Sequence, residues 1–165
     1  MRSSSRTAAT LLDGSNTDTR PVLVVEDCDD DFDTVVDAAT LANVRNRLVR
    51  ATNVVEAAEL LARSPMGMFA FMLLDYNLPG IDGLDFLRQA CLSGLLADLP
   101  AVVLTTSVNP RDRDCFREAG ASAFHVKSVA YTDCLRTLES IFDQWLNKVH
   151  ALGDVKTSPL ERRLA

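Results

Sequence analysis

The chain has 165 residues, of which 47% are hydrophobic and 24% are charged, and its formal net charge is −6. This length and composition are typical of one globular domain with a core of its own, and they argue against a mainly disordered chain. The negative charge argues against a nucleic-acid-binding protein, because such proteins carry a basic footprint.

The sequence also argues against a membrane or secreted protein. The longest apolar run, residues 68–74, is far shorter than the roughly 20 residues that a membrane span needs. Residues 1–20 contain no apolar core of signal-peptide length, so a cytoplasmic location is predicted. The 4 cysteines lie far apart without a C-x-x-C pair, and in that compartment they are expected to be reduced.

The chain is predicted to contain one ordered domain at residues 21–152, between a flexible tail at 1–20 and a mobile tail at 153–165. Its first element is a strand at 22–25, since this continuous apolar run is typical of a strand that is buried on both faces. In chain order there follow a helix at 32–42, a more exposed strand at 47–51 and a helix at 54–62 that begins at a capping box.

The second half continues this alternation. Asn109 before Pro110 is a strong helix-start signal, with a capping residue and then proline in the first helical position. Strands alternating with helices predict an α/β, doubly wound fold, in which a parallel sheet is covered by helices on both faces. The remaining predicted elements are a strand at 69–74, a helix at 83–91, a strand at 101–104, a helix at 110–119, a strand at 123–126 and a helix at 132–152.

Polar or charged residues stand where the predicted strands end. In an open parallel sheet these ends share one edge, and ligands bind in the crevice there. We therefore expect side chains that are spread over about 100 residues to meet in one cleft. They are Glu26, Asp27, Asp75, Thr105 and Lys127.

This set of side chains has a coherent chemistry. Carboxylates that lie close together repel one another, and a hard divalent cation such as Mg²⁺ suits oxygen ligands of this kind. A carboxylate can also act as a nucleophile toward phosphorus, and Asp75 is the best candidate because it ends the longest apolar strand and is followed by a Pro-Gly loop. The Lys127 ammonium and the Thr105 hydroxyl supply the charge and the donor that phosphoryl oxygens need.

The same residues carry a family resemblance over about residues 21–149. The motifs are Val-Val-Glu-Asp at 24–27, Leu-Leu-Asp-Tyr-Asn-Leu-Pro-Gly-Ile-Asp-Gly at 73–83, Val-Leu-Thr-Thr-Ser at 103–107, Ala-Gly-Ala at 119–121 and Val-Lys at 126–127. Together they resemble the receiver domains of two-component response regulators. The resemblance implies a flavodoxin-like (βα)5 sandwich with a five-stranded parallel sheet in the order 2-1-3-4-5.

The resemblance also implies roles for individual residues. Asp75 would accept a phosphoryl group from a phosphohistidine on a histidine kinase or phosphotransfer protein, in an Mg²⁺-dependent reaction. Asp27 would bind Mg²⁺ directly, Glu26 would lie nearby, often with a water between, and the backbone carbonyl of Asn77 would be a further ligand. Such a chain is a phosphoacceptor that assists its own phosphorylation and dephosphorylation, and it is not an enzyme.

Three further residues complete the switch that the resemblance implies. Thr105 would turn toward the phosphoryl group, Phe124 would change rotamer with it, and Lys127 would pair with the phosphoryl oxygens. The family usually has proline after this lysine, whereas here Ser128 follows. Because a cis bond before a residue other than proline costs about 2.5–4 kcal/mol, we predict a trans bond or a rearranged loop.

Two local features allow alternative interpretations. Cys28 is either a buried residue at a helix start or a redox-sensitive thiol beside the metal site. Residues 29–31, all aspartates, either cap the first helix and stay solvated or extend the metal site.

The last predicted helix is long for a domain of this size. Its apolar stripe is interpreted either as a homodimer surface, together with the last strand, or as packing within the chain. The interface candidates are His125, Phe142, Trp145 and Val149.

The sequence thus predicts a stand-alone response regulator whose output is binding. It resembles the small regulators that partner phytochrome-type or other hybrid sensor kinases. The alternative is a degenerate receiver that binds partners without phosphorylation. A hydrolase of the dehalogenase type is disfavoured, because Asp75-Tyr76-Asn77 lacks the second acid of an Asp-x-Asp motif.

Overall fold

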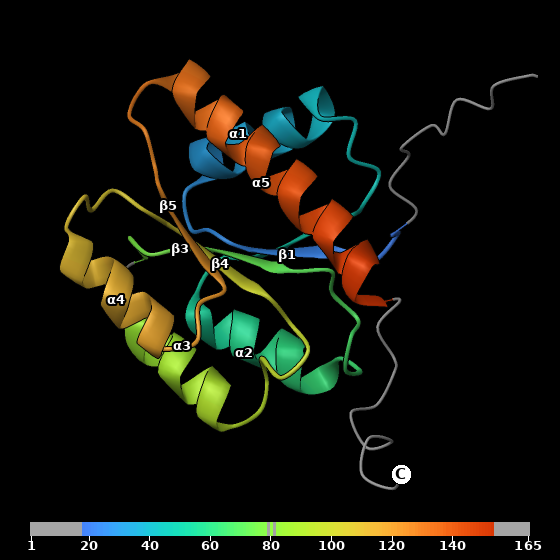
Figure 1. The fold of residues 1–165 in the computed structure, drawn as a ribbon, viewed down its shortest axis with the longest axis vertical. Helices are drawn as coiled ribbons and strands as arrows, with labels where there is room; N and C mark the ends of the chain where they lie inside the picture. Colours follow the sequence, from blue (N-terminus) through green and yellow to red (C-terminus); the bar gives the residue numbers. More distant parts are fainter. Residues whose placement is uncertain (1–17, 79, 81, 154–165) are drawn as a thin grey trace, which may run out of the picture.

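The structure is a computed structural model that describes residues 18–78, 80 and 82–153, with the backbone alone for residues 147–153 (Figure 1). Strands and helices alternate along the described chain. The strands are β1 (Val22–Val25), β2 (Leu48–Ala51), β3 (Met72–Asp75), β4 (Ala101–Thr105) and β5 (Ala123–Val126). The helices are α1 (Asp29–Leu41), α2 (Val54–Arg63), α3 (Gly83–Leu92), α4 (Pro110–Glu118) and α5 (Tyr131–Gly153).

The five strands form one parallel sheet in the order β2-β1-β3-β4-β5, which confirms the predicted fold and strand order. β1, β3 and β4 are the central strands, and their residues are buried throughout. This burial explains why they are continuous apolar runs in the sequence, since both faces of a doubly wound sheet are covered. The two edge strands, β2 and β5, are only partly buried.

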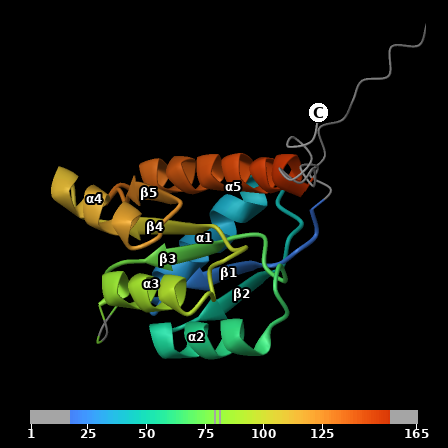
Figure 2. The same cartoon turned by 60° about the horizontal axis from the view of Figure 1, so that its bottom comes forward.

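Helices cover both faces of the sheet. α1 and α5 lie together on one face, and α2 and α3 lie on the other, where α4 also packs (Figure 2). Successive side chains of a strand point to opposite faces, so Val24 belongs to the α1/α5 core and Val25 to the other core. Among the described helices, none combines the length and apolarity that crossing a bilayer requires.

The start of the ordered part differs from the sequence prediction. Asp18 and Arg20 form an ion pair at 2.7 Å, and the Asn46 side-chain amide donates to the backbone oxygens of both residues at 2.7 Å. The chain is therefore held in place before Pro21, because Asn46 ties it to the loop that precedes β2. Residues 1–17 and 154–165, which contain most of the two predicted tails, lie outside the described residues.

Two of the predicted interface residues are part of this chain's own core, so the interface interpretation is corrected for both. Phe142 is 1% exposed and Trp145 is 7% exposed, and both pack in the core between α1, α5 and the sheet. The Phe142 ring meets the Phe71 ring edge to face, with centroids 6.1 Å apart. His125 is half-buried on the edge strand β5, and the side chain of Val149 lies outside the described residues.

Candidate functional site

Four charged side chains meet at the carboxyl edge of the sheet. Glu26 directly follows β1, Asp75 ends β3, Lys127 directly follows β5, and Asp31 lies in the first turn of α1. The Lys127 Nζ atom lies 2.6 Å from Asp75 Oδ2, 2.7 Å from Asp31 Oδ2 and 3.3 Å from Glu26 Oε2. The shared polarity of parallel strands brings these residues together although they are far apart in the chain.

Burial strengthens the electrostatic interactions within this cluster. Glu26 and Asp75 are 3% and 4% exposed, so each carboxylate depends on partners instead of bulk water. Burial, together with the hydrogen bond and the charge of Asp75, raises the pKa of Glu26 to about 7. Burial by itself would lower the pKa of Lys127, but its hydrogen bonds to Asp31 and Asp75 outweigh this effect and raise that pKa.

The carboxylates fit a divalent cation. Glu26, Asp31 and Asp75 each offer one oxygen, and these oxygens lie within 4.8 Å of one another. Several carboxylate oxygens around one small volume are the ligand set that Mg²⁺ and Mn²⁺ use in proteins. The acidic pocket that the sequence predicted is therefore present, and it includes Asp31, one of the aspartates interpreted from the sequence either as a solvated helix cap or as an extension of the metal site.

Asp27 and Asn77 border this cluster. Asp27 is exposed and does not belong to the group of three carboxylates. The Asn77 backbone N–H donates to Asp75 Oδ1 at 2.8 Å, so the turn after β3 orients the Asp75 carboxylate. The Asn77 side chain lies 3.3 Å from the Thr106 hydroxyl, which links this turn to the loop after β4.

Thr105 ends β4, which neighbours β3 in the sheet, and Phe124 lies in β5. Thr105 is fully buried, and its hydroxyl accepts a hydrogen bond from the Ser107 N–H at 3.1 Å. The Phe124 ring packs on Phe116 with centroids 5.4 Å apart, and the Arg113 guanidinium lies 5.9 Å from its centroid. The switch roles that the sequence implies for Thr105 and Phe124 stay predictions.

The peptide bond after Lys127 is trans, as the serine in place of proline predicted, since no cis bond occurs between residues that the structure describes. The Ser128 hydroxyl accepts a hydrogen bond from the Ala130 N–H at 3.2 Å and thereby shapes the turn into α5. Lys127 nevertheless reaches Asp75, so a proline at this position is not needed to place the ammonium.

Of the two interpretations of Cys28, the structure contradicts the buried residue at a helix start, and a redox-sensitive thiol stays a prediction. Cys28 is exposed and occupies the N-cap of α1, where its side chain makes no capping hydrogen bond. Its backbone N–H instead donates to Glu26 Oε1 at 3.0 Å. The acidic loop after β1 is thus folded around the Glu26 carboxylate.

The sequence did not single out Arg50, and it did not predict that Asp31 would bind Lys127. Asp31 binds Lys127, and Arg50, which extends from β2, binds the loop after β1. A sequence signal did exist for Arg50, because a charged residue inside a predicted strand needs a polar partner. The identity of that partner depends on the pairing of β1 with β2, which the residue pattern does not show.

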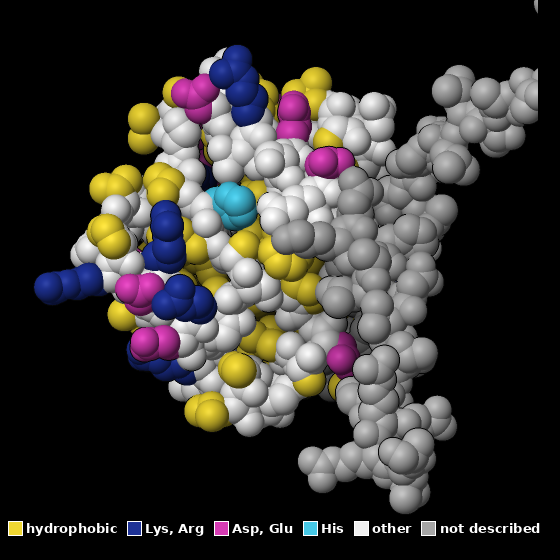
Figure 3. All heavy atoms as spheres, viewed as in Figure 1, with side chains coloured by type: hydrophobic (Ala, Val, Ile, Leu, Met, Phe, Trp, Pro, Cys, Tyr) yellow, Lys and Arg dark blue, Asp and Glu magenta, His cyan; other side chains and the backbone are white. Residues whose placement is uncertain are grey.

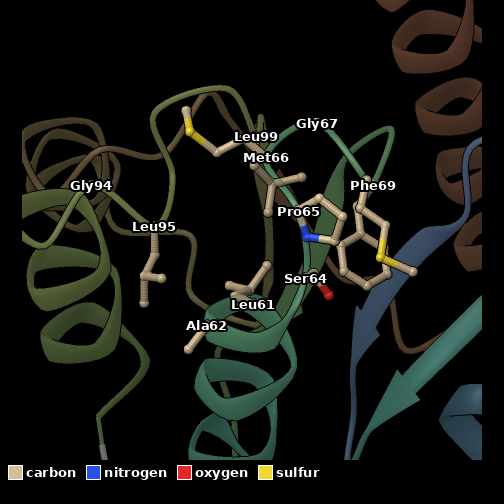
Figure 4. Close-up of a pocket in the computed structure, with 11 residues that line it drawn as sticks. Leu61, Ala62, Ser64, Pro65, Met66, Gly67, Phe69, Gly94, Leu95 and Leu99 are labelled. Carbon is tan, nitrogen blue, oxygen red and sulfur yellow. The ribbon is translucent and has the colours of Figure 1, made fainter.

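A separate pocket lies at the opposite edge of the sheet. Its volume is about 220 Å³, and Figure 4 shows side chains from the end of α2, from the loop before β3 and from the loop before β4 around it. The lining includes Leu61, Met66, Phe69, Leu95 and Leu99. This pocket is not part of the acidic cluster, because strands β3 and β4 begin beside the pocket and end at the cluster.

These features correspond to a known family. Residues 22–139 match the Response regulator receiver domain. The chain belongs to this family. Its acidic cluster and Lys127 lie where the strands of this receiver domain end, and Asp75 is the acid at the end of the central strand β3.

Curated relatives include small chemotaxis proteins. The chemotaxis protein CheY of Pseudomonas aeruginosa is 28% identical over 116 residues, which cover 67% of this chain and 94% of that protein. The probable methanogenesis regulatory protein FilR2 of Methanothrix harundinacea is 36% identical over 75 residues, or 46% of this chain. That match spans 48% of FilR2, so this chain corresponds to about half of it.

Solved structures of response regulators share the fold. The phosphorylated cyanobacterial phytochrome response regulator RcpA has a TM-score of 0.71 at 24% identity, over 79% of this chain and 96% of RcpA. The Mn²⁺-bound form of Rcp1 has a TM-score of 0.69 at 27% identity, with 77% and 94% covered. The bacteriophytochrome response regulator AtBRR is 32% identical with a TM-score of 0.59, covering 76% of this chain and 95% of AtBRR.

Proposed function

We propose that this receiver domain accepts a phosphoryl group on Asp75 and signals through the resulting change at its surface. The observation that carries the proposal is the position of Asp75, which is buried at the end of β3 and bound to the Lys127 ammonium at 2.6 Å. A buried carboxylate with an ammonium beside it is suited to attack phosphorus, because the ammonium can then donate hydrogen bonds to the phosphoryl oxygens and stabilise their negative charge.

In the transfer step, an Asp75 carboxylate oxygen attacks the phosphorus of a phosphohistidine. The new P–O bond forms as the P–N bond breaks, and the electron pair of that bond stays on the imidazole that leaves. The Asn77 backbone N–H orients the carboxylate, and Lys127 is close enough to donate to the phosphoryl oxygens. Burial excludes water, which strengthens both interactions.

The acidic residues around Asp75 are suited to hold Mg²⁺. Glu26 and Asp75 are common to the predicted ligand set and to the group of carboxylates in the structure. Asp27 and the Asn77 carbonyl are further ligands that the family resemblance implies, and Asp31 is the ligand candidate that the structure adds. When bound, Mg²⁺ supplies positive charge that offsets the negative charge of the phosphoryl oxygens.

Phosphoryl uptake from acetyl phosphate tests this function. The wild-type chain with Mg²⁺ is expected to gain the mass of one phosphoryl group in intact-mass spectrometry, and Asp75→Asn is expected to gain none. Asp98→Asn is the matched control, because Asp98 is exposed in the loop before β4 and should leave the gain unchanged. Equal labelling of wild type and Asp75→Asn would contradict Asp75 as the acceptor, and no labelling of either would favour a phosphorylation-independent binding module.

The proposed phosphoryl donor is a sensor histidine kinase, and a phytochrome-type kinase is the specific candidate. Support comes from AtBRR, which is named as a bacteriophytochrome response regulator and is 32% identical to this chain. The test measures the rate of phosphoryl transfer to this chain from a purified phytochrome-type kinase and from an unrelated histidine kinase. Faster transfer is expected from the phytochrome-type kinase. A cytoplasmic location stays a prediction from the sequence.

A homodimer through the last strand and the helices beside it also stays a proposal. β5 is an edge strand with Val126 39% exposed, and α4 beside it carries arginines interspersed with acidic side chains (Figure 3). An unpaired strand edge with an exposed apolar side chain favours self-association. We expect sedimentation to show more dimer when beryllofluoride mimics the phosphoryl group, and a monomer in both states would contradict the proposal.

A further inference from the structure

Arg50 uses every edge of its guanidinium to hold the loop after β1. Its Nε donates to the backbone oxygen of Glu26 at 2.8 Å, and its Nη2 donates to the backbone oxygen of Asp27 at 2.9 Å. Its Nη1 binds Asp29 Oδ1 at 2.6 Å. The two carbonyl acceptors belong to the acidic pair that the sequence predicted as metal ligands.

The strand pairing places Arg50 for these contacts. β1 pairs with β2 so that Arg50 lies opposite Val24, two residues before Glu26. The Arg50 guanidinium also lies 4.8 Å from the centroid of the Phe32 ring in α1, and its side chain is only 21% exposed. The guanidinium is therefore held from the ring face as well as from its edges.

The contacts of Arg50 differ in how strongly they hold the loop after β1. Asp29 is 87% exposed, and an ion pair to so exposed a carboxylate contributes little. The two bonds to backbone oxygens are different, because a planar fork with fixed donors constrains the peptide groups that it binds. These peptide groups set the directions in which the Glu26 and Asp27 side chains leave the chain.

We infer that Arg50 is a positioning residue for divalent-cation binding, which rests on the proposed function of the acidic site. By fixing the carbonyls of Glu26 and Asp27, it holds the acidic loop in its binding shape before the cation arrives. Its own positive charge acts in the opposite direction, because it repels a cation. Positioning and charge therefore predict opposite effects of substitution, so an experiment can separate them.

Calorimetric titration of the unphosphorylated full chain with Mg²⁺ at pH 8 is the direct test. Arg50→Lys keeps the charge but loses the fork, and Arg50→Gln loses both. Positioning predicts that each variant binds Mg²⁺ about 10-fold more weakly, as is typical when a residue that supports metal ligands is changed. Unchanged affinity in Arg50→Lys with tighter binding in Arg50→Gln would show that only the charge matters and would overturn the inference, as would unchanged affinity in both variants.

Two control variants and one further readout complete the design. Arg63→Lys changes an exposed arginine of α2 whose partner is Glu59, and Asp29→Asn removes only the exposed partner of Arg50. Both are expected to leave Mg²⁺ affinity within about 2-fold, since exposed pairs are weak. Thermal melting in EDTA measures any loss of fold in each variant separately from metal binding.

Phosphorylation by acetyl phosphate separates this inference from the proposed function. Saturating Mg²⁺ is expected to restore labelling of Arg50→Lys to the wild-type rate, whereas no Mg²⁺ concentration restores Asp75→Asn. Labelling of Arg50→Lys that stays low at saturating Mg²⁺ would overturn a role limited to cation binding. If wild type binds Mg²⁺ in an Arg50-dependent way but is not phosphorylated on Asp75, the function fails and the inference stands.

Discussion

Replacement of Lys127 by glutamine is expected to lower the free energy of unfolding of the metal-free protein by about 3 kcal/mol at pH 8. The reason is that removing one partner of a buried ion pair leaves the other partner's charge buried without compensation. Lys127 binds Asp75 and Glu26, whose side chains are 5% and 4% exposed. Without the ammonium these two carboxylates repel each other in a site with little water. Urea denaturation in EDTA measures the loss.

The matched control for Lys127→Gln is Arg88→Gln, since Arg88 pairs only weakly with Asp85 on the surface of α3 at 3.4 Å. This variant is expected to change stability by less than about 0.5 kcal/mol. Mg²⁺ should recover part of the stability lost in Lys127→Gln, because a cation replaces the missing positive charge. A loss no larger than that of Arg88→Gln would show that Lys127 does not neutralise the cluster.

The stability of the metal-free protein is expected to fall as pH rises from about 5 to 7.5, because of Glu26. Its pKa is about 7 in the folded chain and 4.5 as a free side chain, so the folded state binds this proton more tightly than the unfolded state does. Folding is therefore favoured while Glu26 is protonated, and this advantage is lost as it ionises. The fall is expected to be about 2 kcal/mol once solvent screening is allowed for.

Glu26→Gln should remove this fall, because glutamine does not titrate. Denaturation in EDTA at several pH values compares the variant with wild type, and Glu59→Gln on the exposed surface of α2 is the control. Burial lowers the pKa of His125, so His125 contributes a slope of opposite sign that is common to all three proteins and cancels in the comparison. An identical pH dependence in wild type and Glu26→Gln would refute the raised pKa.

The residue pattern alone predicted most of the fold and the centre of the site. Apolar runs identified the buried strands, and helical stripes identified the layers, because local burial imposes these periods on any sequence. The convergence of Asp75 with Lys127 also followed, since parallel strands all end at one edge. These predictions needed only the order of the elements, not the distances between side chains.

The order of the elements did not predict which side chains from different helices and strands would contact one another. Asp31 and Lys127 are 96 residues apart, and Arg50 and Glu26 are 24 apart. Whether the first turn of α1 points Asp31 at the cluster or at solvent depends on how α1 is oriented on the sheet. The pairing of β1 with β2 decides in the same way which loop Arg50 reaches.

The last helix also has one property that the sequence predicted and one that only the tertiary structure decided. Its apolar stripe was visible in the sequence, but a stripe does not say whether the sheet or a second molecule covers it. The structure shows the sheet covering Phe142 and Trp145. The chain's own residue order thus determined a receiver fold with Asp75 and Lys127 at one edge, because periodicity and strand polarity are local properties. The partners of Asp31, Arg50 and Trp145 were decided by three-dimensional packing, because they depend on how separate elements approach one another.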